Sequence, residues 1–412
     1  MISINKIEYY LVFIFALANY FLPTEVTFSI ALLGVIFSVW GRGIQKEHLQ
    51  VLTIPLILLG LGFINAYKND FTLVVKDVYY YFNPIIVFSF GYVCAYYLSV
   101  DKFFKVWIVL GVILALAYLF NHNWGSNYTS VRDMRLEEGV ASYVVIIALV
   151  IHLIKIARKE YLFPKPIRYT FLAILSLSSI IAVSRTFLLV FIILIVFGTG
   201  QLKFKKYFIL KFVLISLMGL VVTFALVNFQ VEDRSSFMGK LLNSVDEVAI
   251  SDYNDLGEIN NNWRGFEAFM GWEQINRGNL LEWIVGQGFG KSTPIGLEIQ
   301  LGEEYFTEIP YFHNGYITLI LKTGIIGLLI YIGFFVRLSI KNLKEEFIYN
   351  DDYEICKNII TGLAITLLLT TFIISGWLNK STLAPVIFSL GYFISAKENI
   401  KDFYEEENIE DN

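Results

Sequence analysis

Charged residues, histidines and cysteines are all scarce in this sequence. Only 17% of the 412 residues are charged, whereas an average soluble domain has about 25%. The chain has 2 cysteines, too few for a structural zinc site built from cysteine ligands. Cys94 and Cys356 fall in or near predicted membrane spans on the inner side, so no disulfide is expected. This composition excludes an ordinary soluble domain and a disulfide or zinc scaffold.

Apolar residues are abundant and form long runs. They make up 56% of the chain, and the mean hydropathy is +0.61. About 20 apolar residues in a helix cross a bilayer core, and somewhat fewer suffice when flanking groups reach the headgroups. We therefore predict an all-α polytopic membrane protein with about twelve transmembrane helices. The predicted spans are 7–22, 24–40, 50–66, 83–98, 104–120, 140–157, 168–183, 186–199, 207–228, 324–341, 357–378 and 381–396.

Lysines and arginines indicate how these spans are oriented. The short loops on the side of the N-terminus carry most of them, as in KIARKEYLFPKPIR. Cytoplasmic loops of membrane proteins are enriched in lysine and arginine, so both termini are expected in the cytoplasm. The predicted organisation is transmembrane helices 1–9 within 1–228, a large periplasmic loop at 229–323, helices 10–12 within 324–396, and an acidic, disordered cytoplasmic tail at 397–412.

The large outer loop is polar and acidic. Residues 229–312 include 14 acidic and 5 basic side chains. Within it, RGFEAFMGWEQIN has apolar residues at helical spacing, which predicts an amphipathic helix on the membrane surface or on the bundle. The glycine-rich IVGQGFGKSTPIG predicts a loop. Its GQGFGKS segment lacks the spacing and the strand–loop–helix setting of a nucleotide P-loop, which favours a turn near the membrane surface.

Three arginines on the outer side are candidate anion-binding groups. Arg185 stands alone in a long apolar run, while Arg264 and Arg277 lie in the outer loop. A guanidinium keeps its charge, and its planar fork of donors matches phosphate oxygens. The structural alternatives are a headgroup contact for Arg185 at a tight outer turn and surface ion pairs for Arg264 and Arg277.

His313 is the strongest candidate for a general base, and His122 is its only rival on the outer side. Pro310 precedes the expected start of a helix, which predicts His313 in the first turn. The helix dipole there disfavours the imidazolium and keeps the ring neutral, as a general base requires. The alternative is a histidine whose ring is satisfied by backbone groups at a helix start.

A polar stripe follows this histidine. Asn314, Thr318 and Lys322 recur every four residues and share one helix face, and Asn314 and Lys322 are candidate supporting groups. We expect a short amphipathic helix from about 311 to 323, a break at Thr323–Gly324, and a span from Ile325 onward.

These candidates all fall on the outer side of the membrane, and no Asp-x-Asp metal motif accompanies them there. They predict a metal-free transfer from a donor with a diphosphate leaving group. Arginines would hold the diphosphate, and the histidine would deprotonate a hydroxyl nucleophile. Because nucleotides are confined to the cytoplasm, a lipid diphosphate is the expected donor.

Three motifs carry a resemblance to a known family. They are SRTFLL at the start of a span, WRGFEAFMGWEQI leading to IVGQGFG, and HNGYITLILKTGIIGLL. Their order around a long outer loop resembles that of the O-antigen ligase/polymerase family of bacterial surface polysaccharide synthesis. Polymerases of the family are also described with an arginine, ten further residues and a glycine, a pattern that Arg277 and Gly288 match.

The resemblance implies a GT-C-like helical fold in the bacterial inner membrane, with the active site facing the periplasm. It implies an undecaprenyl diphosphate-linked sugar donor and inverting transfer without metal or other cofactor. Matched by position, His313 is the base, and Arg185 and Arg264 bind the diphosphate.

The acceptor stays open between two family activities. A polymerase transfers the glycan to another lipid-linked repeat unit, the favoured hypothesis, whereas a ligase transfers it to lipid A core. A flippase or other transporter is a third hypothesis, and it predicts charged residues deep in several spans and repeat symmetry. Expected partners are an undecaprenyl diphosphate-linked oligosaccharide as donor and acceptor, membrane lipid and a chain-length regulator protein, with no nucleic acid. The sequence does not name the sugar, the linkage or the polymer.

Overall fold

The computed structural model describes residues 4–43, 45–120, 141–182, 184–200, 259, 262–301, 304–345, 350–379 and 381–410. These residues are mostly helical. The α-helices are α1 (Ile4–Phe21), α2 (Thr24–Arg42), α3 (Lys46–Phe63), α4 (Phe71–Cys94), α5 (Val100–Phe120), α7 (Ala141–Ala157), α8 (Lys165–Ile181), α9 (Arg185–Gly198), α13 (Trp263–Asn276), α14 (Leu280–Val285), α15 (Gly315–Lys344), α16 (Asp351–Ile374) and α17 (Ala384–Glu410). The remaining elements are the 3₁₀ helices η1 (Ala66–Lys68) and η3 (Gly376–Leu378) and the antiparallel strands β1 (Thr293–Leu301) and β2 (Glu304–Ile309). The predicted span 207–228 and His122 lie outside the described residues.

Several of these helices have the length and composition of membrane spans. In the described ranges, four segments are long and apolar enough to cross a membrane: Lys46–Lys68, Val100–Phe120, Gly315–Lys344 and Asp351–Ile374. Shorter apolar helices cover Tyr10–Phe21, Thr24–Trp40, Tyr143–Ala157 and Thr186–Gly198. The chain is therefore a mostly helical protein of the membrane-embedded type.

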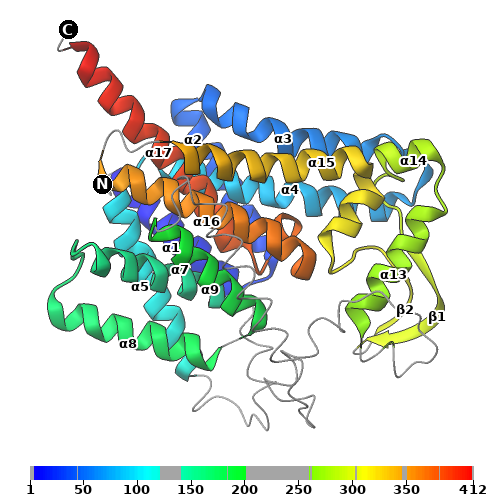
Figure 1. Cartoon of the computed structure of the whole chain (residues 1–412), viewed down its shortest axis with the longest axis horizontal. Coiled ribbons are helices and arrows are strands. Elements are labelled where there is room, and N and C mark those ends of the chain that lie inside the picture. Colours follow the sequence, from blue (N-terminus) through cyan, green and yellow to red (C-terminus); the bar gives the residue numbers. More distant parts are fainter. Residues whose placement is uncertain are drawn as a thin grey trace.

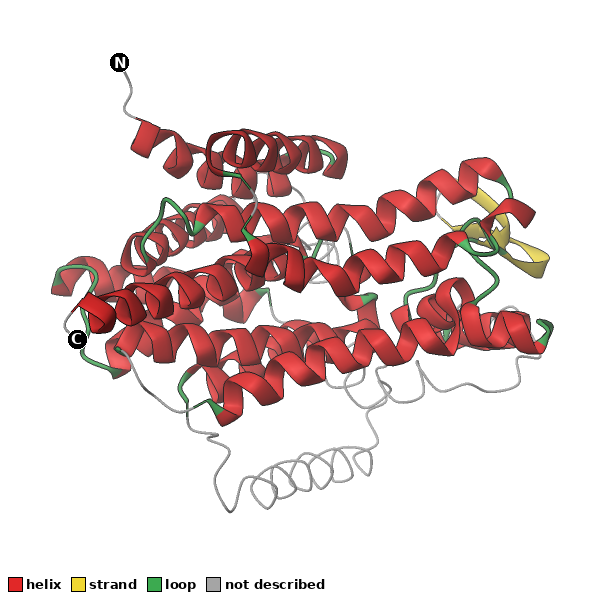
Figure 2. Ribbon diagram, turned by 90° about the horizontal axis from the view of Figure 1, so that it is seen from above, coloured by secondary structure: helices red, strands yellow, loops and turns green. Residues whose placement is uncertain are grey.

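The helices form a bundle with two different ends. Most of them run along the long axis, and both termini lie at the same end (Figures 1 and 2). The helices α13 and α14 and the β1–β2 hairpin gather at the opposite end (Figure 1). The segment between residues 263 and 309 is thus separated from both termini by the length of the bundle.

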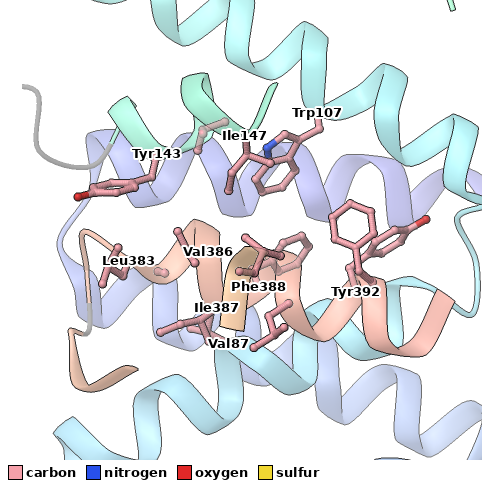
Figure 3. Packing of buried hydrophobic residues seen from close by; sticks show 14 of the residues in the cluster. Val87, Trp107, Tyr143, Ile147, Leu383, Val386, Ile387, Phe388 and Tyr392 are labelled. Atoms are coloured by element: carbon pink, nitrogen blue, oxygen red, sulfur yellow. The ribbon is translucent and has the colours of Figure 1, made fainter. Parts of the chain in front are cut away.

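Aromatic side chains fill the centre of the bundle. Trp107 of α5 stacks on Phe388 of α17, with ring centroids 5.5 Å apart and planes 7° from parallel (Figure 3). Phe103 stacks on Tyr392 at 3.6 Å. The backbones of α4 and α17 meet where Gly91 faces the carbonyl of Phe388, a contact that any Cβ would block. Small residues at a helix crossing allow such close approach in membrane proteins.

Two expectations about local structure are wrong. The glycine-rich stretch, expected to be loop throughout, is loop only between α14 and β1, because Thr293 begins a strand paired with Ile309. The acidic tail, expected to be disordered, continues α17 as far as Glu410. Contacts with distant residues hold its first turn: the Tyr92 hydroxyl donates to Glu398 at 2.7 Å, and Asn399 donates to the carbonyl of Ala95 at 3.0 Å.

The break in the helix after His313 is confirmed. Gly324 has φ 68° and ψ −174°, which divides α15 into a first piece from Gly315 and a longer second piece. A Cβ at Gly324 would collide with the carbonyl of Ile284, so α14 packs directly against the break. Only glycine adopts this backbone conformation without strain.

Candidate active site

The start of α15 fixes the position of His313. Asn314 is the N-cap, and its side-chain oxygen accepts hydrogen bonds from the N–H groups of Tyr316 at 3.0 Å and Ile317 at 3.4 Å. His313 therefore precedes the cap, and the prediction that it lies in the first turn is wrong. Half of its side chain is exposed, so solvent and small molecules can reach the ring.

A buried carboxylate orients the imidazole. Oε2 of Glu267 lies 2.7 Å from Nδ1 of His313 and accepts a hydrogen bond from the backbone N–H of the same residue at 3.2 Å. The Glu267 side chain is only 6% exposed. A carboxylate accepts hydrogen bonds, so Nδ1 is the donor in this contact, and in the neutral ring Nε2 then has the lone pair. This is the arrangement in which a histidine acts as a general base and its carboxylate stabilises the imidazolium that forms.

Glu267 was not among the site residues predicted from the sequence. It lies on α13, three residues after Arg264, so the two side chains share one helix face. A carboxylate within the apolar stretch GFEAF was the signal that a polar partner is buried there. Nothing local identifies that partner as His313, which is 46 residues further along the chain.

His313 and Arg264 line one pocket. It has a volume of about 360 Å³ and lies where α4, α13, the start of α15 and the α16–α17 connection meet. The lining residues are Tyr80, Arg264, Tyr311, Phe312, His313, Ile374, Ser375, Leu378, Asn379, Ser381 and Thr382. A histidine and a permanent cation thus line the same pocket, which is the pairing expected for deprotonating a nucleophile beside an anionic leaving group.

A strained turn forms part of the lining of this pocket. Ser375, at the end of α16, has φ 70°, a conformation that is uncommon outside glycine. Its hydroxyl lies 3.2 Å from the carbonyl oxygens of both Phe312 and His313 and donates to them. Gly315 packs against the Ser375 backbone at a distance that leaves no room for a Cβ. Strained residues cluster at binding sites, where the surrounding structure holds them.

Lys322, the other candidate supporting group, lies outside the His313 pocket in a buried ion pair. Its ammonium donates to Oδ2 of Asp77 at 2.6 Å and to the carbonyl of Lys291, and the Lys322 side chain is 1% exposed. Asp77 also accepts a hydrogen bond from the N–H of Gly290 at 2.6 Å. The lysine therefore joins α15 to α4 and to the glycine-rich loop, and it does not line the His313 pocket.

The glycine-rich loop between α14 and β1 packs against residues at the start of α4 and next to η1. Gly286, Gly288 and Gly290 have φ of 88°, 87° and 80°. Asn65 and Asn69, on either side of η1, donate to the carbonyls of Gly286, Gln287 and Phe289 at 2.7 to 2.9 Å. The glycines are needed because the loop adopts positive φ angles where it packs against the helices. This agrees with its interpretation as a turn and not as a phosphate cradle.

The other two arginines are placed differently from each other. Arg277 is exposed and caps the C-terminal end of α13, whereas Arg264 lies in the first turn. At 1.5 Å per residue the two are separated by about 20 Å along the helix, too far to hold one diphosphate.

Arg185 is the first residue of α9, after the N-cap Ser184. Leu194 of α9 lies against Gly362, and Gly198 lies against Ile359. The two helices are therefore antiparallel, and the start of α9 lies toward the end of α16 that forms the pocket. Arg185 and the His313 pocket thus belong to the same end of the bundle.

Comparison of the chain with known proteins does not assign it to a family. No protein-family model matches the chain, and no curated protein matches it either. The residues of the pocket themselves are therefore the basis for a functional conclusion.

Proposed function

We propose that this protein is a glycosyltransferase that moves a glycan from undecaprenyl diphosphate to the hydroxyl of another lipid-linked repeat unit, as an O-antigen or surface polysaccharide polymerase does. The observation that carries the proposal is the pocket lined by both Arg264 and His313, in which Nδ1 of His313 lies 2.7 Å from Oε2 of Glu267. A base with a buried carboxylate partner beside a cation suits a reaction that deprotonates a hydroxyl and expels an anion.

The reaction is a single displacement. Nε2 of His313 takes the proton of the acceptor hydroxyl as its oxygen forms a bond to the anomeric carbon of the donor sugar. The bond from that carbon to the diphosphate oxygen breaks, and both of its electrons leave with the diphosphate. Attack opposite the leaving group inverts the anomeric configuration. Glu267 stabilises the imidazolium, and Arg264 stabilises the departing diphosphate.

Arg185 completes this proposal as a second diphosphate-binding group at the same end of the bundle. The proposal includes a GT-C-like bundle of about twelve spans in the inner membrane, both termini in the cytoplasm, and the pocket facing the periplasm. The positions of the termini and of α13 at opposite ends agree with this orientation (Figure 1). Transfer to lipid A core, as by a ligase, uses the same base and leaving group and differs only in the acceptor.

The test is transfer by the purified chain in lipid nanodiscs supplied with lipid-linked repeat units. His313→Gln keeps a polar side chain of similar length but lacks the base, and we expect it to lower the rate at least about 100-fold, a typical contribution of a general base. His152→Gln is the matched control, because His152 hydrogen-bonds the carbonyl of Arg168 and does not line the pocket. Equal rates for wild type and His313→Gln would remove His313 from the mechanism.

A further inference from the structure

The His313 pocket has lining residues of two kinds. Arg264 lies in the first turn of α13, and the candidate base His313 directly precedes the N-cap of α15. The other lining residues that the structure describes belong to α4, to 311–312, and to 374–379 and 381–382, and they carry aromatic rings, aliphatic groups, an amide and hydroxyl groups. The pocket is therefore divided between an ionic part and a neutral polar part.

Two tyrosines form the aromatic wall. Tyr80 and Tyr311 stack with ring centroids 4.3 Å apart and planes 24° from parallel. The Tyr311 hydroxyl donates to the carbonyl of Leu378 at 3.0 Å, which fixes the pair against the α16–α17 connection. Burial raises the pKa of the Tyr311 phenol well above its ordinary value, so the group stays protonated and keeps donating. A rigid aromatic face of this kind offers a large apolar contact at low cost in side-chain entropy.

Two residues with hydroxyl groups form another part of the lining. Asn379 holds the loop: its side-chain oxygen accepts from the N–H groups of Ser381 at 3.3 Å and Thr382 at 2.8 Å, and its amide donates to the carbonyl of Ile374 at 3.0 Å. Ser381 and Thr382 line the pocket, and within the described part of the chain neither hydroxyl makes a hydrogen bond. The side chain of Asn379 thus fixes the backbone of two hydroxyl-bearing residues beside the pocket.

We propose that Tyr80, Tyr311, Ser381 and Thr382 form a carbohydrate subsite that holds the sugar bearing the attacking hydroxyl. A sugar ring has an apolar C–H face that packs on an aromatic face and an equatorial rim of hydroxyls that exchange hydrogen bonds with serine and threonine. Tyr80, Tyr311, Ser381 and Thr382 are uncharged, so the leaving group is assigned to Arg264 and the neutral sugar to these four residues. The assignment rests on the proposed function, because it takes His313 as the base for that sugar's hydroxyl.

The experiment separates sugar binding from diphosphate binding. Mild acid releases the free oligosaccharide from lipid-linked repeat units, and its binding to the full chain in nanodiscs is measured by saturation-transfer NMR. Undecaprenyl diphosphate without sugar is the second probe, measured by the shift it causes in thermal unfolding. Neither readout requires turnover.

The expected result is a double dissociation. The double variant Ser381→Ala/Thr382→Val weakens oligosaccharide binding about 10- to 100-fold, which is the loss of two hydrogen bonds. Tyr80→Leu weakens it about 3- to 10-fold, while Tyr80→Phe keeps the aromatic face and binds as wild type. None of these variants changes undecaprenyl diphosphate binding by more than about twofold, whereas Arg264→Ala weakens the diphosphate at least about 10-fold and leaves the oligosaccharide unaffected.

A matched control and the contrary outcomes complete the design. Thr53→Val removes an exposed hydroxyl of α3 that bonds only within its own helix, to Leu49 at 2.9 Å, and should bind both probes as wild type. Oligosaccharide binding unchanged by Ser381→Ala/Thr382→Val, in a chain that performs transfer, would overturn the subsite and leave the proposed function standing. Binding that depends on these residues in a chain without transfer would overturn the proposed function alone.

Discussion

The buried Lys322–Asp77 ion pair gives the sharpest prediction about stability. The two side chains are 1% and 4% exposed, and their charged atoms are 2.6 Å apart. At an effective dielectric constant near 20 their attraction is about 6 kcal/mol, but removing each ion from water cancels most of that gain. Removing one partner strands the other charge in the interior, which costs about 3–5 kcal/mol.

A double-mutant cycle tests this reasoning. Lys322→Met and Asp77→Asn should each destabilise the chain by about 3–5 kcal/mol. In the double variant no charge is stranded, and the amide oxygen that replaces the Asp77 carboxylate still faces the N–H of Gly290. The total loss should therefore be smaller than the sum of the single losses by about 2–3 kcal/mol.

The assay is reversible unfolding in mixed micelles titrated with SDS, followed by circular dichroism. Lys341→Met, a lysine near the exposed end of α15, is the control and should change the free energy of unfolding by less than about 0.5 kcal/mol. Additive losses in the double variant would show that the two charges do not stabilise each other, and the assignment of Lys322 to a structural pair would then be wrong.

The remaining predictions concern the pocket and the helix break. Glu267→Gln should lower the transfer rate about 10- to 1000-fold with little change in donor KM, because the carboxylate acts through His313; an unchanged rate in steady-state assays would contradict that role. Arg264→Ala should raise the donor KM at least about 10-fold, while Arg277→Ala, about 20 Å away on the same helix, should match wild type; equal effects would reject the separation inferred for the two arginines. Gly324→Ala should destabilise the chain by about 1–3 kcal/mol in the SDS assay, since alanine is strained at φ 68° and its Cβ meets the Ile284 carbonyl; a neutral effect would mean that α14 does not pack against the break.

The helical frame and the break after His313 were predictable because they depend on local pattern. Long apolar runs indicate helices, and α13 follows from apolar residues at helical spacing in RGFEAFMGWEQIN. The Thr323–Gly324 pair interrupts a helix because glycine alone tolerates a positive φ without strain.

The sequence of β1 contains a strand pattern that directly follows the glycine-rich segment. Ile295, Leu297, Ile299 and Leu301 alternate with other residues along β1, which is the period of a strand. The loop assignment gave more weight to the glycines of the preceding segment than to this alternation.

Contacts between distant residues were not predictable. Lys322 has the spacing of a polar stripe with Asn314, but its partner Asp77 is 245 residues away. Glu267 and His313 meet only because α13 packs on the first piece of α15. The helical tail is held in the same way, by residues of α4.

The most direct test of the central claim is incubation of the purified chain with a single lipid-linked repeat unit and no other acceptor. Products are separated by size after release from the lipid. The proposed function predicts a ladder of oligomers with wild type and none with His313→Gln. Absence of any new glycosidic bond with wild type, both alone and after addition of lipid A core, would contradict it, whereas transfer only to lipid A core would make the chain a ligase.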